Sequence, residues 1–258
     1  MKRSLAIAGI LALSCVGMAL SYQSWLVYPV LLVGAALMLL VGREALDAAF
    51  YLLGLTLGSA IDVGQTASGV TVYAAPAALL MLPGFVFLYW ALSGIALRHM
   101  TRLIGPCRPH PTDVALFATA IGLSLTANLS PWLAFALMLL ALGLRCCWVR
   151  QRGDALAAVL GIALGPGLES ILLSHGLYHF PSSGSALVPL WLVALYACIG
   201  VSARSFVAYA EQAASSLGGW LLKPRGRRPA PRAPLRRLGP SPGSRRGSRG
   251  SGAGPGRS

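Results

Sequence analysis

Eight long runs of apolar residues limit what this chain can fold into more than any other feature of its sequence. A helix that crosses a bilayer core of about 30 Å needs roughly 17 to 25 mostly apolar residues. The composition agrees, because 56% apolar against 11% charged residues is typical of integral membrane proteins. The runs cover residues 4–20, 24–41, 48–69, 74–97, 114–128, 131–148, 155–175 and 186–208. We therefore predict an all-α integral membrane protein with about eight transmembrane helices.

The placement of charged residues supports this number independently of hydropathy. If the amino terminus with Lys2 and Arg3 is cytoplasmic, every connection on the cytoplasmic side carries arginine. The connections on the other side contain no Lys, Arg, Asp or Glu; they are residues 21–24, 70–75, 128–130 and 176–185. This is the positive-inside pattern. It predicts a multi-pass protein of the cell inner, or cytoplasmic, membrane with both termini in the cytoplasm.

The chain also repeats itself. Residues 25–69, moved forward by 107 positions without a gap, match residues 132–176 at 12 of 45 positions. The matches include a tryptophan, an arginine, an aspartate and three glycines in one register, and Asp62 falls on Glu169, which indicates an internal duplication. Four spans per half is an even number, so both halves enter the membrane in the same direction. We predict two parallel four-helix repeats, residues 1–107 and 108–222, related by a pseudo-twofold axis along the membrane normal.

Residues 223–258 differ from the rest of the chain. They hold 11 of the 21 basic residues and no acidic or aromatic residue, among Pro, Gly and Ser. Such a segment cannot bury a core, so we expect a disordered cytoplasmic tail. Its charge predicts adsorption to anionic lipid head groups. Nucleic-acid binding is the alternative, but without aromatic residues that stack on bases we predict no specific nucleic-acid partner.

Asp62 and Glu169 are the two carboxylates that the predicted spans place inside the membrane. Each lies on a helical stripe of small or polar residues: Gly54, Gly58, Gln65 and Gly69 in the first half, and Gly161, Gly165 and Gly176 in the second. Small residues let helices approach closely, so the stripes are expected to face protein rather than lipid. Ionisable residues at this depth are costly and point to function. We predict that Asp62 and Glu169 form a catalytic pair; alternatively, each acid is only a structural hydrogen-bond partner of Gln65, Ser59 or Ser170.

The chain turns just outside each acid, and these turns supply further candidates. The predicted substrate-binding residues are Tyr73, Gln65, Tyr178, His175 and His179. The two tyrosines could instead be interfacial aromatic residues. His175 and His179 have the spacing of a metal pair on a helix, but a glycine and a proline end the helix there. We predict no metal site, and the chain contains no motif for a nucleotide or other cofactor.

At these residues the chain resembles two groups of membrane proteins. The first half is similar to a bacterial family of small multipass membrane proteins of unknown function, through Tyr22-Gln23-Ser24-Trp25, Gly58, Asp62, Gly69, Tyr73, Trp90 and His99. The second half, with Gly165-Pro-Gly-Leu-Glu169 and then Gly176, Tyr178 and Pro181, is similar to the membrane carotenoid hydratases. There the acidic-glycine-tyrosine signature implies acid-assisted addition of water to an isoprenoid double bond. The resemblance assigns this role to Glu169, Gly176 and Tyr178, and the duplication extends it to Asp62, Gly69 and Tyr73.

Three kinds of function remain open. As a lyase or hydratase, or an isomerase of the cyclase type, the protein would take a membrane isoprenoid or other lipid; one carboxylic acid would protonate a double bond while its partner stabilises the cation or activates water. As a transporter it would bind a proton or cation at the same pair. The third is a non-catalytic membrane assembly protein. The predicted depth of the acids, near the outer face, favours the enzyme, because repeat transporters usually bind at the midplane.

Overall fold

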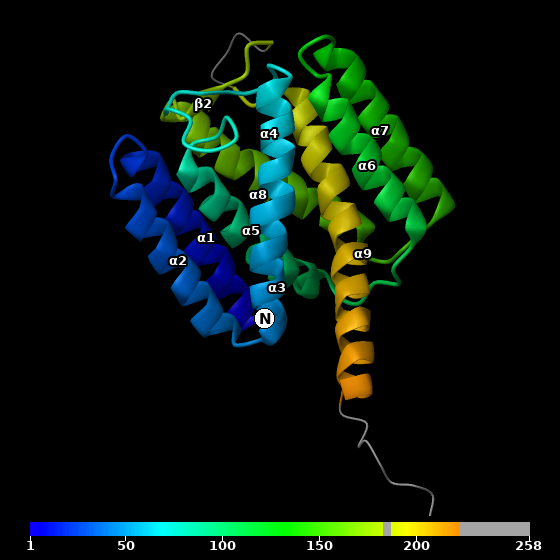
Figure 1. The fold of residues 1–258 in the computed structure, drawn as a ribbon. Helices are drawn as coiled ribbons and strands as arrows, with labels where there is room; N and C mark the ends of the chain where they lie inside the picture. Colours follow the sequence, from blue (N-terminus) through cyan, green and yellow to red (C-terminus); the bar gives the residue numbers. More distant parts are fainter. Residues whose placement is uncertain (183–186, 222–258) are drawn as a thin grey trace, which may run out of the picture. The chain divides into compact units, whose positions relative to one another are not determined.

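The computed structural model of the protein describes residues 1–182 and 187–221. In these residues the helices run alternately toward opposite ends of the molecule (Figure 1). The first half forms α1 (Lys2–Ser21), α2 (Val27–Gly42), α3 (Ala45–Leu53), the π-helical turn η1 (Gly54–Gly58), α4 (Ser59–Ala67) and α5 (Gly84–Ile104). The second forms α6 (Pro111–Leu125), α7 (Pro131–Trp148), α8 (Asp154–Ser174) and α9 (Leu190–Leu221). Two short strands, β1 (Val72–Tyr73) and β2 (Tyr178–His179), pair antiparallel.

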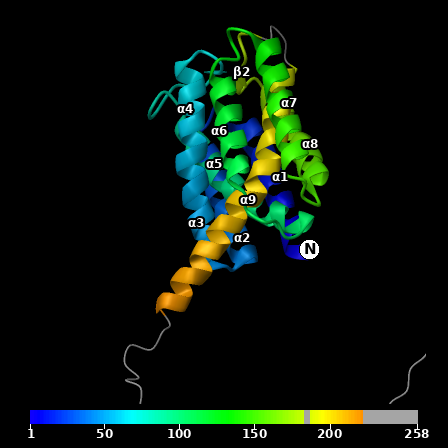
Figure 2. The ribbon, with the colours of Figure 1, turned by 90° about the vertical axis from the view of Figure 1, so that its right-hand side faces the viewer.

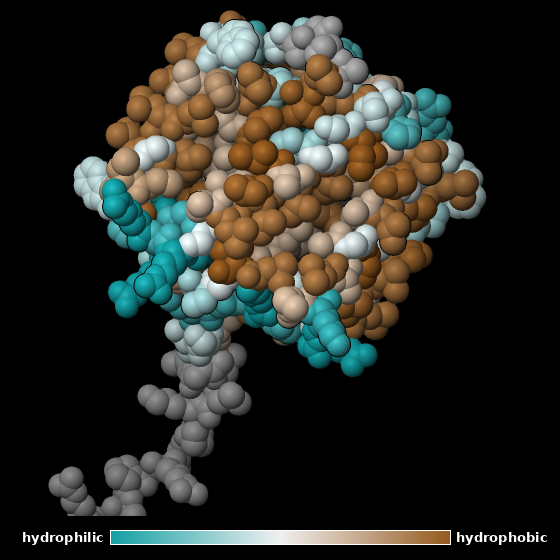
Figure 3. Space-filling view, turned by 180° about the vertical axis from the view of Figure 1, so that it is seen from behind, coloured by the Kyte–Doolittle hydropathy of each residue, from teal (hydrophilic) through white to brown (hydrophobic). Residues whose placement is uncertain are grey.

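These elements confirm the predicted all-α integral membrane fold. In the described residues, five helices are long and apolar enough to cross a membrane: Lys2–Ser21, Ala45–Ala67, Pro131–Trp148, Asp154–Ser174 and Leu190–Ser216. Helices α2 and α6 are apolar but shorter, and α5 is not among the five because it carries polar residues such as Arg98 and His99. The back face of the molecule is mostly hydrophobic, with hydrophilic residues gathered mainly along its lower edge (Figure 3). A protein with such a surface is stable only in an apolar solvent such as the bilayer.

Two predicted spans have different bounds in the structure. The fourth was expected from residue 74, but α5 begins at Gly84 and runs to Ile104. Residues 74–83 form an irregular segment in which Leu80 and Met81 have positive φ angles, and Pro83 caps α5. Proline disfavours a helical conformation of the residue before it, which explains why the apolar run does not stay helical. The last helix likewise begins after Pro189 and continues past residue 208 to Leu221.

The helices of each half surround a shared interior. Helices α1 and α2 lie on one side and α6 and α7 on the other, with α3 to α5, α8 and α9 between them (Figures 1 and 2). Apolar side chains such as Ile7, Leu31 and Leu92 are fully buried in the core. Residues Met1–Gly218 form one compact unit, and a second unit, Gly219–Ser258, adds only the end of α9 to the described residues. The predicted basic tail, residues 223–258, lies outside them.

Both helices that carry the acids are irregular just before the acid. The π-turn Gly54–Gly58 joins α3 to α4 four residues before Asp62, and Pro166 lies inside α8 three residues before Glu169. A π-turn and a proline each interrupt the regular backbone hydrogen bonds of a helix. The two helices are therefore deformed at matching places in the two halves.

Candidate functional site

Asp62 and Glu169 lie on helices that end in the same way. The backbone N–H of Val70 donates to the carbonyl of Gln65 at 2.8 Å, and that of Leu177 donates to the carbonyl of Leu172 at 3.1 Å. The glycine before each donor has a positive φ, 70° at Gly69 and 72° at Gly176. This is the Schellman helix end, in which glycine takes the left-handed conformation without strain. The turn directs the following residues back over the acid as β1 and β2.

Close glycine contacts bring a second helix against each acid. A Cβ on Gly54 would overlap the backbone carbonyl of Trp90, and a Cβ on Gly161 would overlap that of Tyr196. One turn further along, Gly58 packs on the ring of Trp90 and Gly165 on the ring of Tyr196. Small residues at a helix crossing permit this approach. The glycine stripes therefore place one aromatic side chain of α5 and one of α9 beside the carboxylates.

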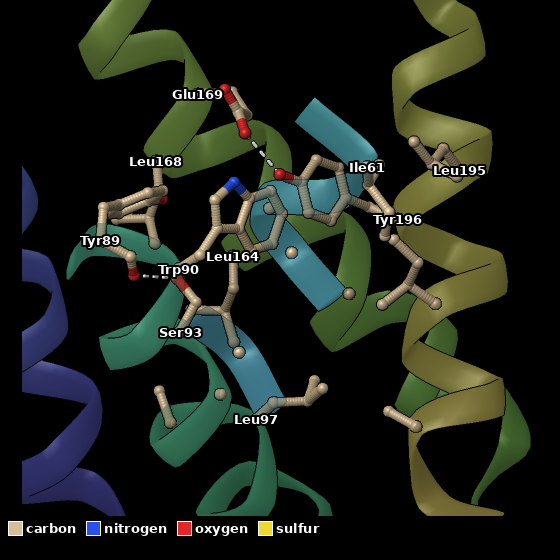
Figure 4. Close-up of a pocket in the computed structure, with 18 of the residues that line it drawn as sticks. Ile61, Tyr89, Trp90, Ser93, Leu97, Leu164, Leu168, Glu169, Leu195 and Tyr196 are labelled. Carbon is tan, nitrogen blue, oxygen red and sulfur yellow. Dashed lines mark hydrogen bonds between the residues drawn. The ribbon is translucent and has the colours of Figure 1, made fainter. Parts of the chain in front are cut away.

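These aromatic side chains are hydrogen-bonded to the acids. One oxygen of Asp62, Oδ2, accepts from the hydroxyl of Tyr73 at 2.6 Å and from the indole Nε1 of Trp90 at 2.7 Å. Oε1 of Glu169 accepts from the hydroxyl of Tyr196, and the two side chains point toward one another in Figure 4. Among the described residues, the second oxygen of each acid has no hydrogen-bond partner. Both acids are buried, with 8% of each residue exposed.

The two strands bring the halves together above the acids. Tyr73 pairs with Tyr178 in the β1–β2 ladder, and their ring centroids are 5.5 Å apart. Tyr178 also contacts Phe180 edge to face. The Tyr178 hydroxyl is buried and has no hydrogen-bond partner in the described part of the chain. The equivalent hydroxyl of Tyr73 donates to Asp62, so the two halves differ here.

A cavity of about 310 Å³ lies below the strands, and both acids line it. Helices α4, α5, α8 and α9 supply most of its wall. On α5 the lining extends from Val86 to Ile104, which corresponds to about 27 Å at 1.5 Å per residue, so the cavity is elongated along the helices. Most of the lining side chains are apolar, and the polar ones gather near the acids. Such a space suits a long apolar molecule with one reactive or polar position.

The structure brings most of the predicted site residues to this cavity. Asp62, Glu169, Tyr73, Gln65 and Tyr178 all line it. The amide of Gln65 is already engaged on both sides, since Nε2 donates to Ser124 at 3.1 Å and Oε1 accepts from Thr71 at 3.5 Å. Gln65 therefore supports the cavity wall rather than offering a free group to a ligand.

The two predicted histidines do not reach the cavity, which corrects their assignment as substrate-binding residues. His175 is exposed at the end of α8, where its Nδ1 lies 2.8 Å from the carbonyl of Ile171. His179 is exposed on β2, because successive side chains of a strand alternate and Tyr178 takes the inward position. Within the described residues, no group of three or more His, Cys, Asp or Glu side chains could hold a metal ion.

Three residues of the cavity wall were not predicted as site residues: Trp90, Tyr196 and Tyr89. Trp90 and Tyr196 are 106 positions apart, one less than the register that relates the acids. Gly94 and Gly200, and Arg98 and Arg204, share this shifted register. A comparison that allowed one gap would have found these pairs. Nothing in the sequence singles out Tyr89, which lines the cavity beside Trp90 with ring centroids 6.2 Å apart.

The other five carboxylates are all paired with arginine at the opposite end of the helices from the strands. The pairs are Glu44 with Arg98 and Arg102, Asp47 with Arg98, Asp113 with Arg145, Asp154 with Arg145 and Arg204, and Glu211 with Arg98 and Arg102. In the connection between α2 and α3, hydrogen bonds from Arg102 and then Arg98 lower the pKa of Glu44 to about 2, against the opposing effect of its partial burial. In the described residues, only Asp62 and Glu169 lack a basic partner among the seven carboxylates.

Comparison with known proteins agrees with a multipass membrane fold. Residues 120–216 match the model of a family described as "Protein of unknown function (DUF2878)". Two crystal structures of MvINS, a mycobacterial Insig homolog from Mycobacterium vanbaalenii, are similar to this chain at 22% identity, with TM-scores of 0.53 and 0.52. One of them is a cross-linked trimer. The similarity covers 65% and 64% of this chain and 95% and 93% of the solved chains. A search of curated proteins finds no significant match.

Proposed function

We propose that the protein binds a membrane isoprenoid or similar long-chain lipid in its cavity and adds water to a double bond of that lipid. The observation that carries the proposal is the pair of buried acids in the wall of an elongated and mostly apolar cavity. In the described residues, one carboxyl oxygen of each acid accepts no hydrogen bond. An apolar chain would gain from burial there. Both acids would contact the bound chain at one position along its length. The resemblance of Glu169, Gly176 and Tyr178 to the carotenoid hydratase signature supports the same reaction.

The hydrogen bonds suggest separate roles for the two acids. Asp62 accepts two donated hydrogen bonds and Glu169 accepts one, and each such bond stabilises the ionised form of a carboxyl. We therefore assign Glu169 as the protonated acid and Asp62 as the carboxylate. Glu169 would give its proton to one alkene carbon, leaving a cation on the neighbouring carbon. Water would add to that carbon and lose a proton to Asp62, which gives the alcohol. Exchange with water would return the proton to Glu169.

A second candidate is a non-catalytic membrane assembly protein. Hydrogen bonds from Tyr73, Trp90 and Tyr196 are also what a purely structural role of the acids would require. A proton- or cation-coupled transporter would use the same unpaired acids. The experiment below separates catalysis from these alternatives.

The setting in the cell is part of the proposal. We place the arginine-rich helix ends in the cytoplasm and the β1–β2 end outside, in the cell inner membrane, because the positive-inside pattern requires it. The tail of residues 223–258 would adsorb to anionic lipid head groups on the cytoplasmic side. This would hold the tail at the membrane without a protein partner.

The test is lipid analysis of a strain that lacks the gene, complemented with single variants. Asp62→Asn and Glu169→Gln should each abolish formation of the hydroxylated lipid, while the thermal midpoint in detergent is kept or slightly raised. Asp62→Leu and Glu169→Leu should also be inactive but less stable, because they leave the aromatic donors unpaired. Glu211→Gln, which changes an acid on α9 about 22 Å along the helix from Tyr196 at 1.5 Å per residue, is the matched control and should stay active. Normal lipid hydration in both amide variants would refute the reaction.

A further inference from the structure

In the described part of the chain, the cavity has no basic group opposite its two acids. All other carboxylates of the protein are paired with arginine, as described above. Asp62 and Glu169 instead have only uncharged donors, and in the described residues no Lys, Arg or His lines the cavity. In a medium of low dielectric constant, a carboxylate without a partner strongly favours a nearby positive charge. With Glu169 protonated, a positive charge on the ligand would supply the partner that the Asp62 carboxylate lacks.

Aromatic side chains surround the same position. Tyr73, Tyr89, Trp90, Tyr178, Phe180 and Tyr196 all line the cavity. They come from β1, α5, β2 and its following residue, and α9, so they approach the acids from both halves. Figure 4 shows Tyr89, Trp90 and Tyr196 around the space below Glu169. Aromatic faces attract cations, and an apolar site strengthens this attraction because the cation is desolvated.

We infer that the cavity stabilises one positive charge on a bound long-chain molecule, at the level of Asp62 and Glu169. This inference rests on the proposed binding of a long-chain lipid and concerns the charge that forms on that lipid. In the proposed reaction the charge is the tertiary carbocation formed when the double bond is protonated. A stable ammonium ion of the same shape reproduces that charge without reacting. Such an ion should bind as a mimic of the intermediate.

The experiment compares two probes that carry the same prenyl chain. The first is a fifteen-carbon prenyl dimethylammonium ion and the second is the neutral fifteen-carbon prenyl alcohol. Binding to the purified full-length protein in a neutral detergent is measured by calorimetry and by the shift of the thermal midpoint. The ammonium ion should bind wild-type protein about tenfold or more tightly than the alcohol, which equals about 1.4 kcal/mol.

Variants then test which residues cause the preference for the ammonium ion over the alcohol. The double variant Asp62→Asn with Glu169→Gln should bind both probes about equally, because the amides keep the shape and remove the charge. Trp90→Phe keeps a ring and should retain part of the preference, whereas Trp90→Leu should lose more. Glu211→Gln serves as the control and should behave as wild type. Equal binding of the two probes to wild-type protein, or binding of neither, would overturn the inference whatever the variants do.

Failure of the reaction and failure of this inference are distinguishable. If the lipid of the gene-deficient strain is unchanged but the ammonium ion is still preferred, the hydration step is wrong and the cation site stands. If hydration is lost in the amide variants while wild-type protein shows no preference for the ammonium ion, the site acts without selecting positive charge.

Discussion

Arg98 shows how a charged side chain can lie fully inside an apolar helical protein. Its guanidinium donates to Asp47 and, at 2.5 Å, to Glu44, and its Cζ lies 5.8 Å from the centre of the Phe50 ring. His99 contacts the same Asp47 at 2.9 Å. Both Arg98 and Asp47 have no exposed surface. A buried pair of this kind is tolerated because each charge is satisfied by the other.

Removal of one partner should therefore cost more than removal of both. Arg98→Met should lower the free energy of unfolding by about 3 to 5 kcal/mol, because Asp47 is left as a buried charge without its main partner. The double variant Asp47→Asn with Arg98→Met should recover much of this loss. Unfolding in mixed micelles measures both. A double variant as unstable as the single one would show that the pair acts through packing rather than charge.

The helix pairs α3–η1–α4 with α5 and α8 with α9 are built around glycine crossings. Gly54 and Gly94 pack backbone to backbone in the first pair, and Gly161 and Gly200 do the same in the second. The crossing fixes how far Trp90 and Tyr196 lie from the acids. The geometry of the site therefore depends on glycines that line the cavity but carry no reactive side chain.

Adding a methyl group at a crossing should separate the helices. Gly54→Ala and Gly161→Ala should each destabilise the protein by about 1 to 3 kcal/mol and weaken ligand binding, because the new Cβ meets backbone that cannot move aside. Gly122→Ala and Gly143→Ala are matched controls within helices α6 and α7, where nothing lies within 4 Å of the new Cβ. They should be neutral or slightly stabilising, since alanine favours the helix. Thermal melts in detergent compare the four variants, and equal effects would contradict the crossing model.

The two halves of the molecule share contacts that correspond pair by pair. Asp47 with Arg98 matches Asp154 with Arg204, and the helix ends at Gly69 and Gly176 match in their hydrogen bonds. Tyr73 and Tyr178, which follow the corresponding helix ends at Gly69 and Gly176, pair with each other where the halves meet. This arrangement is what a twofold axis along the membrane normal would produce. The duplication itself stays a prediction. The halves differ at the tyrosines, because the Tyr73 hydroxyl donates to Asp62 whereas the Tyr178 hydroxyl has no hydrogen-bond partner in the described residues.

The orientation in the membrane can be measured directly. Reporter fusions after Arg43, Gly105 and Arg152 should report the cytoplasm. Fusions after Tyr73 and Leu129 should report the exterior. We expect this because the helix ends that the first set follows all lie at one end of the molecule (Figure 1), and that end is rich in arginine. A reporter that is inactive on one side of the membrane distinguishes the two sets. An exterior signal after Gly105 would contradict the alternating eight-helix topology.

Much of this fold follows from the sequence alone, because hydropathy and charge act locally. Apolar runs predicted helices near their observed positions. The matching register pointed to Asp62 and Glu169, and the turns just outside them pointed to Tyr73 and Tyr178. The structure places all four at one cavity. Local patterns failed where proline overrode hydropathy, in residues 74–83, and where strand alternation turned His179 outward.

Contacts between distant segments depend on how the helices pack, so local sequence patterns do not predict them. Trp90 and Tyr196 reach the acids because glycines at other positions let two helices meet. The sequence around Trp90 or Tyr196 does not indicate this contact. The pairing of Arg98 and Arg204 with acids 50 or more positions away has the same origin. Hydropathy along the chain predicts which segments are apolar enough to cross a membrane, since transfer free energy depends on each segment separately. Which carboxylates are paired with arginine, and which two lack a basic partner, depends on how the helices pack.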